Sequence, residues 1–95
     1  MNTMEQIASK IIKEQELIIG PLAWDRAEKV VGLHVVDKKS GVVSIDSGVD
    51  VRMVIDNLVK VYEHLFGRAS HEVCREVARP FLINLTPAEI PMSLQ

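Results

Sequence analysis

The sequence predicts one mainly helical α+β domain, in the order helix, helix, short β-hairpin, helical hairpin. Three observations predict this fold class. Apolar residues recur at helical spacing in four segments, β-branched residues gather on both sides of a polar break within 33–46, and glycine or proline marks the segment ends. Because 95 residues fit one domain and can bury a working core, we expect residues 1–95 to form a single small globular unit.

The first helix is expected over residues 4–18. Thr3 and Gln6 have the spacing of a capping box, in which each side chain satisfies a free backbone amide of the first turn. Gly20 and Pro21 provide the stop, since glycine tolerates a left-handed exit and proline cannot continue the ladder of amide hydrogen bonds. The apolar stripe consists of Met4, Ile7, Ala8, Ile11 and Ile12.

The second helix is expected to open at Pro21, which suits the first helical position, and to end at Gly32. Its apolar face consists of Ala23, Ala27, Val30 and Val31, with Trp24 beside it. The next stretch predicts a hairpin, with strands at 33–36 and 42–46 joined by a five-residue polar loop. The alternative is a longer second helix that reaches Lys39, which would make the protein an all-α bundle. The density of valine favours the hairpin.

Residues 51–66 form the most apolar of the expected helices. Ten of these sixteen residues are apolar, and most of them fall within an arc of about 160° at the 100° per residue of an α-helix. A surface helix needs an apolar stripe of only about 100°. We therefore expect this helix to lie at the centre of the core or at an oligomer interface, with Ser47 or Asp50 as its N-cap and Gly67 at its end.

The last helix is expected to begin at an N-cap on Ser70 and to stop or kink near Arg79, because Pro80 cannot donate a hydrogen bond within a helix. Its short connection to the preceding helix predicts an antiparallel helical hairpin. The Thr-Pro-Ala-Glu segment at 86–89 is a further start signal. Residues 86–95 are therefore expected to form a short helical turn or a docking arm.

Composition narrows the classes of function. The net charge is −2 with a pI near 5.9, so the chain lacks the basic excess that drives binding to a phosphate backbone. The N-terminus shows no signal segment, no apolar tract is long enough to cross a bilayer, and the single cysteine fits a reducing compartment. We therefore expect a cytoplasmic protein that does not associate with membranes and for which nucleic acid is not the expected partner.

No catalytic or cofactor-binding motif is visible, so neither an enzyme nor a cofactor is expected. The only pair with ligand-like spacing on one helix face is His71 with Cys74, near a helix start that would lower the pKa of a thiol. Together with His64 these residues are the candidates for a metal or small-molecule site. Cys74 also belongs to the apolar stripe of its helix, and a structural zinc site needs four ligands. The favoured interpretation is a buried structural cysteine and a surface histidine.

A nucleic-acid-associated regulator is a further alternative. Its contacts would be five basic side chains: Lys38, Lys39, Arg68, Arg75 and Arg79. The two lysines stand at the expected hairpin tip, where solvated lysines also protect an edge strand from aggregation. Arg75 and Arg79 are flanked by acidic residues at helical spacing, which predicts a charge-paired surface rather than a binding site.

An excess of aliphatic residues is the remaining indication of function. Four amphipathic helices have to share one small core, so we expect surplus apolar surface to be buried by self-association, most simply in a two-fold dimer, or by another protein. The expected function is thus a non-enzymatic interaction or regulatory module. The residues expected at its interface are Trp24, Met53, Phe81, Leu82, Ile83 and Leu85.

Overall fold

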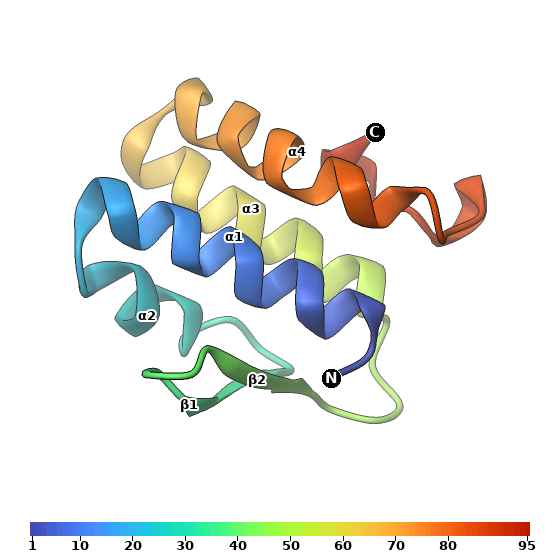
Figure 1. Ribbon diagram of the computed structural model, residues 1–95, viewed down its shortest axis with the longest axis horizontal. Helices are drawn as coiled ribbons and strands as arrows, with labels where there is room; N and C mark the ends of the chain where they lie inside the picture. Colours follow the sequence, from blue (N-terminus) through green and yellow to red (C-terminus); the bar gives the residue numbers. More distant parts are fainter.

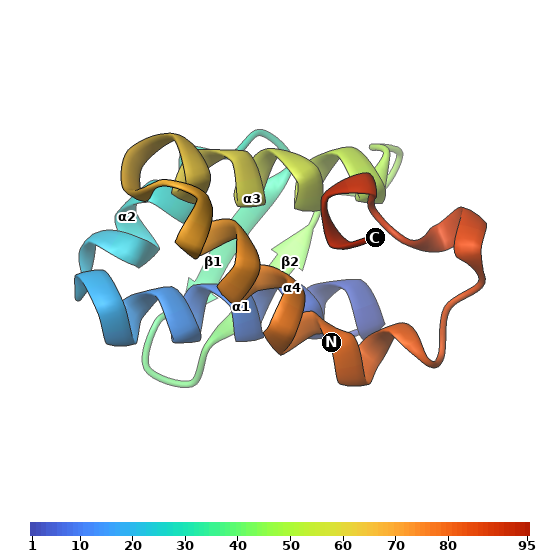
Figure 2. The ribbon, with the colours of Figure 1, turned by 90° about the horizontal axis from the view of Figure 1, so that it is seen from above.

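The computed structural model describes residues 1–95 and confirms the predicted fold class and element order. The elements are helices α1 (Thr3–Ile19) and α2 (Leu22–Ala27), strands β1 (Leu33–Asp37) and β2 (Val42–Ile45), helices α3 (Val51–Phe66) and α4 (Arg68–Leu82), and two 3-10 turns, η1 (Pro87–Glu89) and η2 (Met92–Leu94). Figure 1 shows three layers: the hairpin and α2 lie below α1 and α3, and α4 lies above them. In Figure 2, α4 crosses the space between α1 and α3.

Helix α1 begins one residue earlier than expected because Asn2, and not Thr3, is its N-cap. Asn2 Oδ1 accepts the backbone N–H of Glu5 at 2.9 Å, and Glu5 Oε1 accepts that of Asn2 at 3.0 Å, which is the reciprocal pattern of a capping box. The second carboxylate oxygen of Glu5 accepts the N–H of Ile45 at 3.0 Å. One acidic side chain therefore both caps α1 and ties it to β2.

Helix α2 is shorter than expected, and turns replace its second half. Val30 is buried but Val31 is 85% exposed, so the predicted apolar face ends at Val30. The chain reverses at Gly32, whose φ of +89° favours glycine. Beyond it the hairpin prediction is confirmed: β1 and β2 pair in antiparallel fashion, with Leu33 opposite Ile45. The alternative of a second helix that reaches Lys39 in an all-α bundle is wrong.

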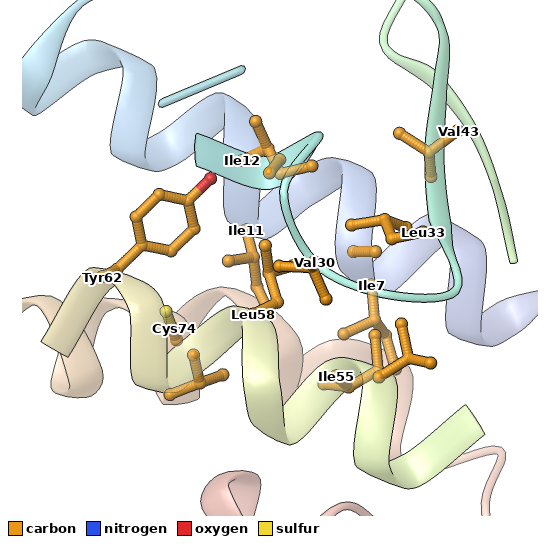
Figure 3. Close-up of a cluster of buried hydrophobic side chains, with 14 of the residues drawn as sticks. Ile7, Ile11, Ile12, Val30, Leu33, Val43, Ile55, Leu58, Tyr62 and Cys74 are labelled. Carbon is orange, nitrogen blue, oxygen red and sulfur yellow. The ribbon is translucent and has the colours of Figure 1, made fainter. Parts of the chain in front are cut away.

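Helix α3 has the predicted bounds and the predicted central position. Asp50 is its N-cap and accepts the N–H of Arg52 at 3.1 Å. The helix contacts α1, α2, α4 and η2, and Figure 3 shows Ile55, Leu58 and Tyr62 of α3 within the cluster of buried side chains. Five of its side chains are buried: Val54, Ile55, Leu58, Val59 and Tyr62. The middle of the apolar face thus packs into the core of the chain, whereas Met53, Leu65 and Phe66 are exposed.

Helix α4 differs from the expectation at both ends. It begins at Arg68, directly after Gly67, so Ser70 is not an N-cap; it is buried within the helix, and its carbonyl accepts a hydrogen bond from Gln15 Nε2 at 3.1 Å. The helix also continues past Pro80 to Leu82 instead of stopping near Arg79. Pro80 and the residue four positions earlier are exposed, so water can satisfy the carbonyl that the missing N–H leaves free.

The folded chain exposes 5497 Å², close to the value of about 5,500 Å² expected for a compact monomer of its mass. The core consists of 18 apolar residues drawn from every helix and both strands. Trp24 belongs to it with 2% exposure. None of the helices combines the length and the apolar character needed to cross a bilayer.

Candidate functional site

The C-terminal arm, residues 86–95, folds back over the helices. Figure 2 shows it returning from the end of α4 towards α3, and its last turn, η2, contacts both helices. Pro91 and Leu94 are buried there, whereas Met92 is 78% exposed. Leu94 is thus the residue through which the last turn of the arm packs on the helices, and Met92 faces solvent.

His71 joins α4 to both α3 and the arm. Its Nδ1 lies 2.6 Å from Glu63 Oε2, and its Nε2 lies 2.7 Å from the carbonyl oxygen of Ser93. A carboxylate and a carbonyl are both acceptors, so both contacts are hydrogen bonds only when both ring nitrogens carry a proton. The arrangement therefore suits the imidazolium form, with 26% of the His71 side chain exposed.

The charge on His71 is consistent with its surroundings. The Ser93 carbonyl raises the pKa of His71 most, and the carboxylates of Glu63 and Glu72 raise it further, while burial acts in the opposite direction. Next to this contact, Asp56 accepts hydrogen bonds from the Ser93 N–H at 2.9 Å and from its hydroxyl at 2.6 Å. Three groups of Ser93, its N–H, its hydroxyl and its carbonyl, are thus hydrogen-bonded to side chains of α3 and α4.

Cys74 and His71 do not form a ligand pair. Cys74 is fully buried against α1, where its sulfur accepts a hydrogen bond from Gln15 Nε2 at 3.6 Å, and burial raises its pKa to about 11. Both ring nitrogens of His71 already have partners, and the exposed His64 lines a hollow beside α2 that does not include His71. No group of three or more His, Cys, Asp or Glu side chains is placed to hold a metal ion.

The five basic candidates for nucleic-acid contact are spread over opposite layers. Lys38 and Lys39 lie at the hairpin tip, and the arginines lie on α4 at the far side of the molecule (Figure 1). Three of the five form ion pairs: Lys38 with Asp25 at 3.4 Å, Arg75 with Glu72 at 3.2 Å, and Arg79 with Glu76 at 3.1 Å. Lys39 and Arg68 are exposed without an ion pair. The set does not form one basic surface.

The expected interface residues are also dispersed. Trp24 lies in the core and donates its indole N–H to Glu16 Oε2 at 2.8 Å, so it has almost no surface to offer a partner. Met53, Phe81 and Leu85 line three different surface hollows. Ile83 is 85% exposed and Leu82 is half-buried. Met53 and Ile83 are thus the members of the set with the most accessible surface.

A different apolar surface lies where α1 and α3 end and α2 begins. Both views place these three helix ends at the same end of the molecule (Figures 1 and 2). We name this surface the apolar end; it consists of Leu17, Ile18, Leu22, Leu65 and Phe66, with exposures from 79% for Leu17 down to 36% for Phe66.

The apolar end is not among the predicted sites, although the sequence contains a signal for it. Leu17, Ile18 and Ile19 are consecutive, and three consecutive helical residues span about 200° and cannot all face one core. Leu65 and Phe66 continue the apolar pattern of residues 51–66, which predicts a place in the core, but both are exposed.

Comparison of the chain with models of protein families, with curated proteins and with solved structures found no match.

Proposed function

We propose that the protein is a non-enzymatic interaction module and that it pairs with a second copy of itself through the apolar end. The exposure of two adjacent large side chains, Leu17 at 79% and Ile18 at 58%, is the observation that carries the proposal. Large apolar side chains that remain exposed near one another are typical of sites where proteins associate. Leu65 and Phe66 extend it onto the end of α3.

A second copy is a suitable partner because an apolar surface is complementary to itself under two-fold symmetry. None of the five residues of the apolar end is charged, and the net charge of −2 opposes pairing only weakly. A free thiol at Cys74 supports a reducing compartment, so we propose that pairing takes place in the cytoplasm.

The expected affinity is modest. Burying one Leu, Ile or Phe side chain completely is worth about 1.5–3 kcal/mol. The five side chains of each copy are 36–79% exposed, so a symmetric pair gains roughly 10 kcal/mol in all from their burial. Association itself costs at least about 4 kcal/mol. The net gain is at most about 6 kcal/mol, so the dissociation constant is expected between about 40 μM and the millimolar range.

Sedimentation velocity over a concentration series tests the proposal. Leu17→Lys places a charge on the apolar end and is expected to abolish self-association, whereas Val36→Lys, at a 64% exposed position on β1, is the matched control and should leave it unchanged. Ile83→Lys probes the interface expected from the sequence. A wild-type protein that stays monomeric at millimolar concentration, or pairing that Ile83→Lys abolishes and Leu17→Lys does not, would contradict the proposal.

A further inference from the structure

We propose that the groove between α2 and α3 binds a small phosphate-bearing ligand. Two adjoining hollows of about 510 and 190 Å³ form this groove, and both are lined by Lys29, Val61 and His64. Both hollows are open to solvent, so they suit a ligand that is bound at the surface and only partly enclosed. The groove is separate from the His71 contact, and its smaller hollow shares Leu65 with the apolar end.

Four basic side chains line the groove without acidic neighbours. Arg26 and Lys29 come from the α2 side, and Lys60 and His64 come from α3; no Asp or Glu lines either hollow. None of the four forms an ion pair, whereas Lys10, Lys38, Arg52, Arg75 and Arg79 all do. Unneutralised cations thus gather here in a chain whose net charge is negative. Such a concentration of positive charge attracts anions.

The guanidinium of Arg26 adds a donor that lacks an acceptor. Its Nε is buried and has no hydrogen-bond partner, and a buried donor without an acceptor costs about 1–3 kcal/mol. The planar fork of an arginine matches the paired oxygens of a phosphate group. That nitrogen is closed to solvent, so a phosphate in the groove would be bound by the terminal N–H groups of Arg26, which lines the smaller hollow.

The facing wall of the groove presents donors at regular intervals. Asn57, Lys60 and His64 are three and four residues apart on α3, so their side chains follow one face of the helix in successive turns. An amide, an ammonium group and an imidazole therefore face the basic groups of the α2 side. Donors from two walls can contact different oxygens of one anionic group.

Charge and shape favour a phosphate ester over a carboxylate. The groove holds three permanent cations, Arg26, Lys29 and Lys60, which a single carboxylate would neutralise only in part. A phosphate monoester carries about −1.5 to −2 at neutral pH. Val30, Val61 and Leu65 line the same hollows and provide apolar contact for an organic group attached to the phosphate. The ligand class is thus a soluble phosphate monoester with an apolar body.

Titration of the 15N-labelled protein with phenyl phosphate, followed by NMR, tests the assignment. We expect saturable shifts confined to residues 26–31 and to α3, and binding at least threefold tighter than that of inorganic phosphate. Lys29→Gln and Lys60→Gln should each weaken binding at least fivefold. Both residues are exposed, so the variants are expected to keep the fold, and their spectra report it directly. Lys39→Gln, at an exposed lysine of the hairpin tip, is the matched control and should bind like the wild type.

Three results would overturn the assignment. Shifts that grow without saturation would show non-specific attraction of anions to lysines, as would an equal loss of affinity in Lys39→Gln. Equal binding of inorganic phosphate would remove the role of the apolar wall. A glutamate-rich peptide that binds the groove more tightly than phenyl phosphate would assign it to an acidic protein segment instead.

Discussion

Replacing His71 by leucine should release the C-terminal arm and lower the free energy of unfolding. Leucine has roughly the volume of the imidazole but cannot donate to Glu63 or to the carbonyl of Ser93, which lie 2.6 and 2.7 Å from the ring nitrogens. The variant therefore removes two hydrogen bonds and leaves the apolar contacts of Leu94 in place.

The expected loss in the free energy of unfolding follows from how exposed the two hydrogen bonds of His71 are. A hydrogen bond to a charged group is worth about 1.5–3 kcal/mol, and the contact with the Ser93 carbonyl is assigned about 1.5 kcal/mol because it is half-buried. The side chain of Glu63 is 42% exposed, so solvent screening limits that pair to at most about 1 kcal/mol. The expected loss is about 2 kcal/mol in acid, or roughly 10 °C in Tm for a domain of this size.

The loss should depend on pH. The pKa of His71 is raised above its ordinary 6.5 in the folded state, so the stability that its charge contributes is complete below pH 6.5 and disappears as pH rises through the higher folded pKa. Glu63 and Asp56 of α3 and Glu72 of α4 are the acidic groups near this contact. The difference between wild type and His71→Leu should therefore be largest at pH 5.5 and should shrink towards pH 9.

Urea unfolding at four pH values measures the loss of stability and its pH dependence. Hydrogen exchange at the Leu94 amide measures the release of the arm. That amide donates to the Pro91 carbonyl within η2, so its exchange rate reports arm release. His34→Leu is the control, because His34 Nε2 lies 2.7 Å from Asp46 Oδ1 but both side chains are more than half exposed. A difference for His71→Leu that is constant from pH 5.5 to 9, or an equal loss in His34→Leu, would contradict the proposed role of the His71 charge.

Two further variants and one thiol reagent test the packing of the core. Tyr62→Phe removes the hydroxyl that donates to the Ala23 carbonyl at 2.7 Å and should cost about 1–2 kcal/mol in urea unfolding; an unchanged midpoint would contradict that bond. Ile55→Ala should cost about 2–5 kcal/mol because Ile55 is fully buried, and a loss below 1 kcal/mol would argue against its central position. Cys74, buried and with a pKa near 11, should react with a thiol reagent at pH 8 far more slowly in the native than in the unfolded protein, and equal rates would contradict its burial.

Local patterns predicted most of the fold because each element carries its own signals. The bounds of α3 follow from its wide apolar face between Asp50 and Gly67, and valine-rich strands around a polar break predict the hairpin. Errors arose where two signals compete within one turn. Asn2 caps α1 in place of Thr3, and Pro80 is tolerated inside α4 because it lies on the exposed face.

The candidate sites were less predictable because they depend on contacts between distant segments. Nothing local to His71 indicates that Glu63 and Ser93 will meet it from two other elements. The cations of the α2–α3 groove are likewise separated by about thirty residues in sequence, and their lack of acidic partners is visible only after folding. Sequence periodicity places a residue on a face, but it does not identify which face remains uncovered.

The contact between two copies can be observed directly with a mixture of isotope-labelled and unlabelled protein at millimolar concentration. Isotope-filtered NMR detects nuclear Overhauser effects between methyl groups of different chains. If two copies pair through the apolar end, we expect such effects among Leu17 and Ile18 of α1 and Leu65 of α3. No effect between chains at that concentration, or effects at Ile83 and Leu85 instead, would contradict this pairing.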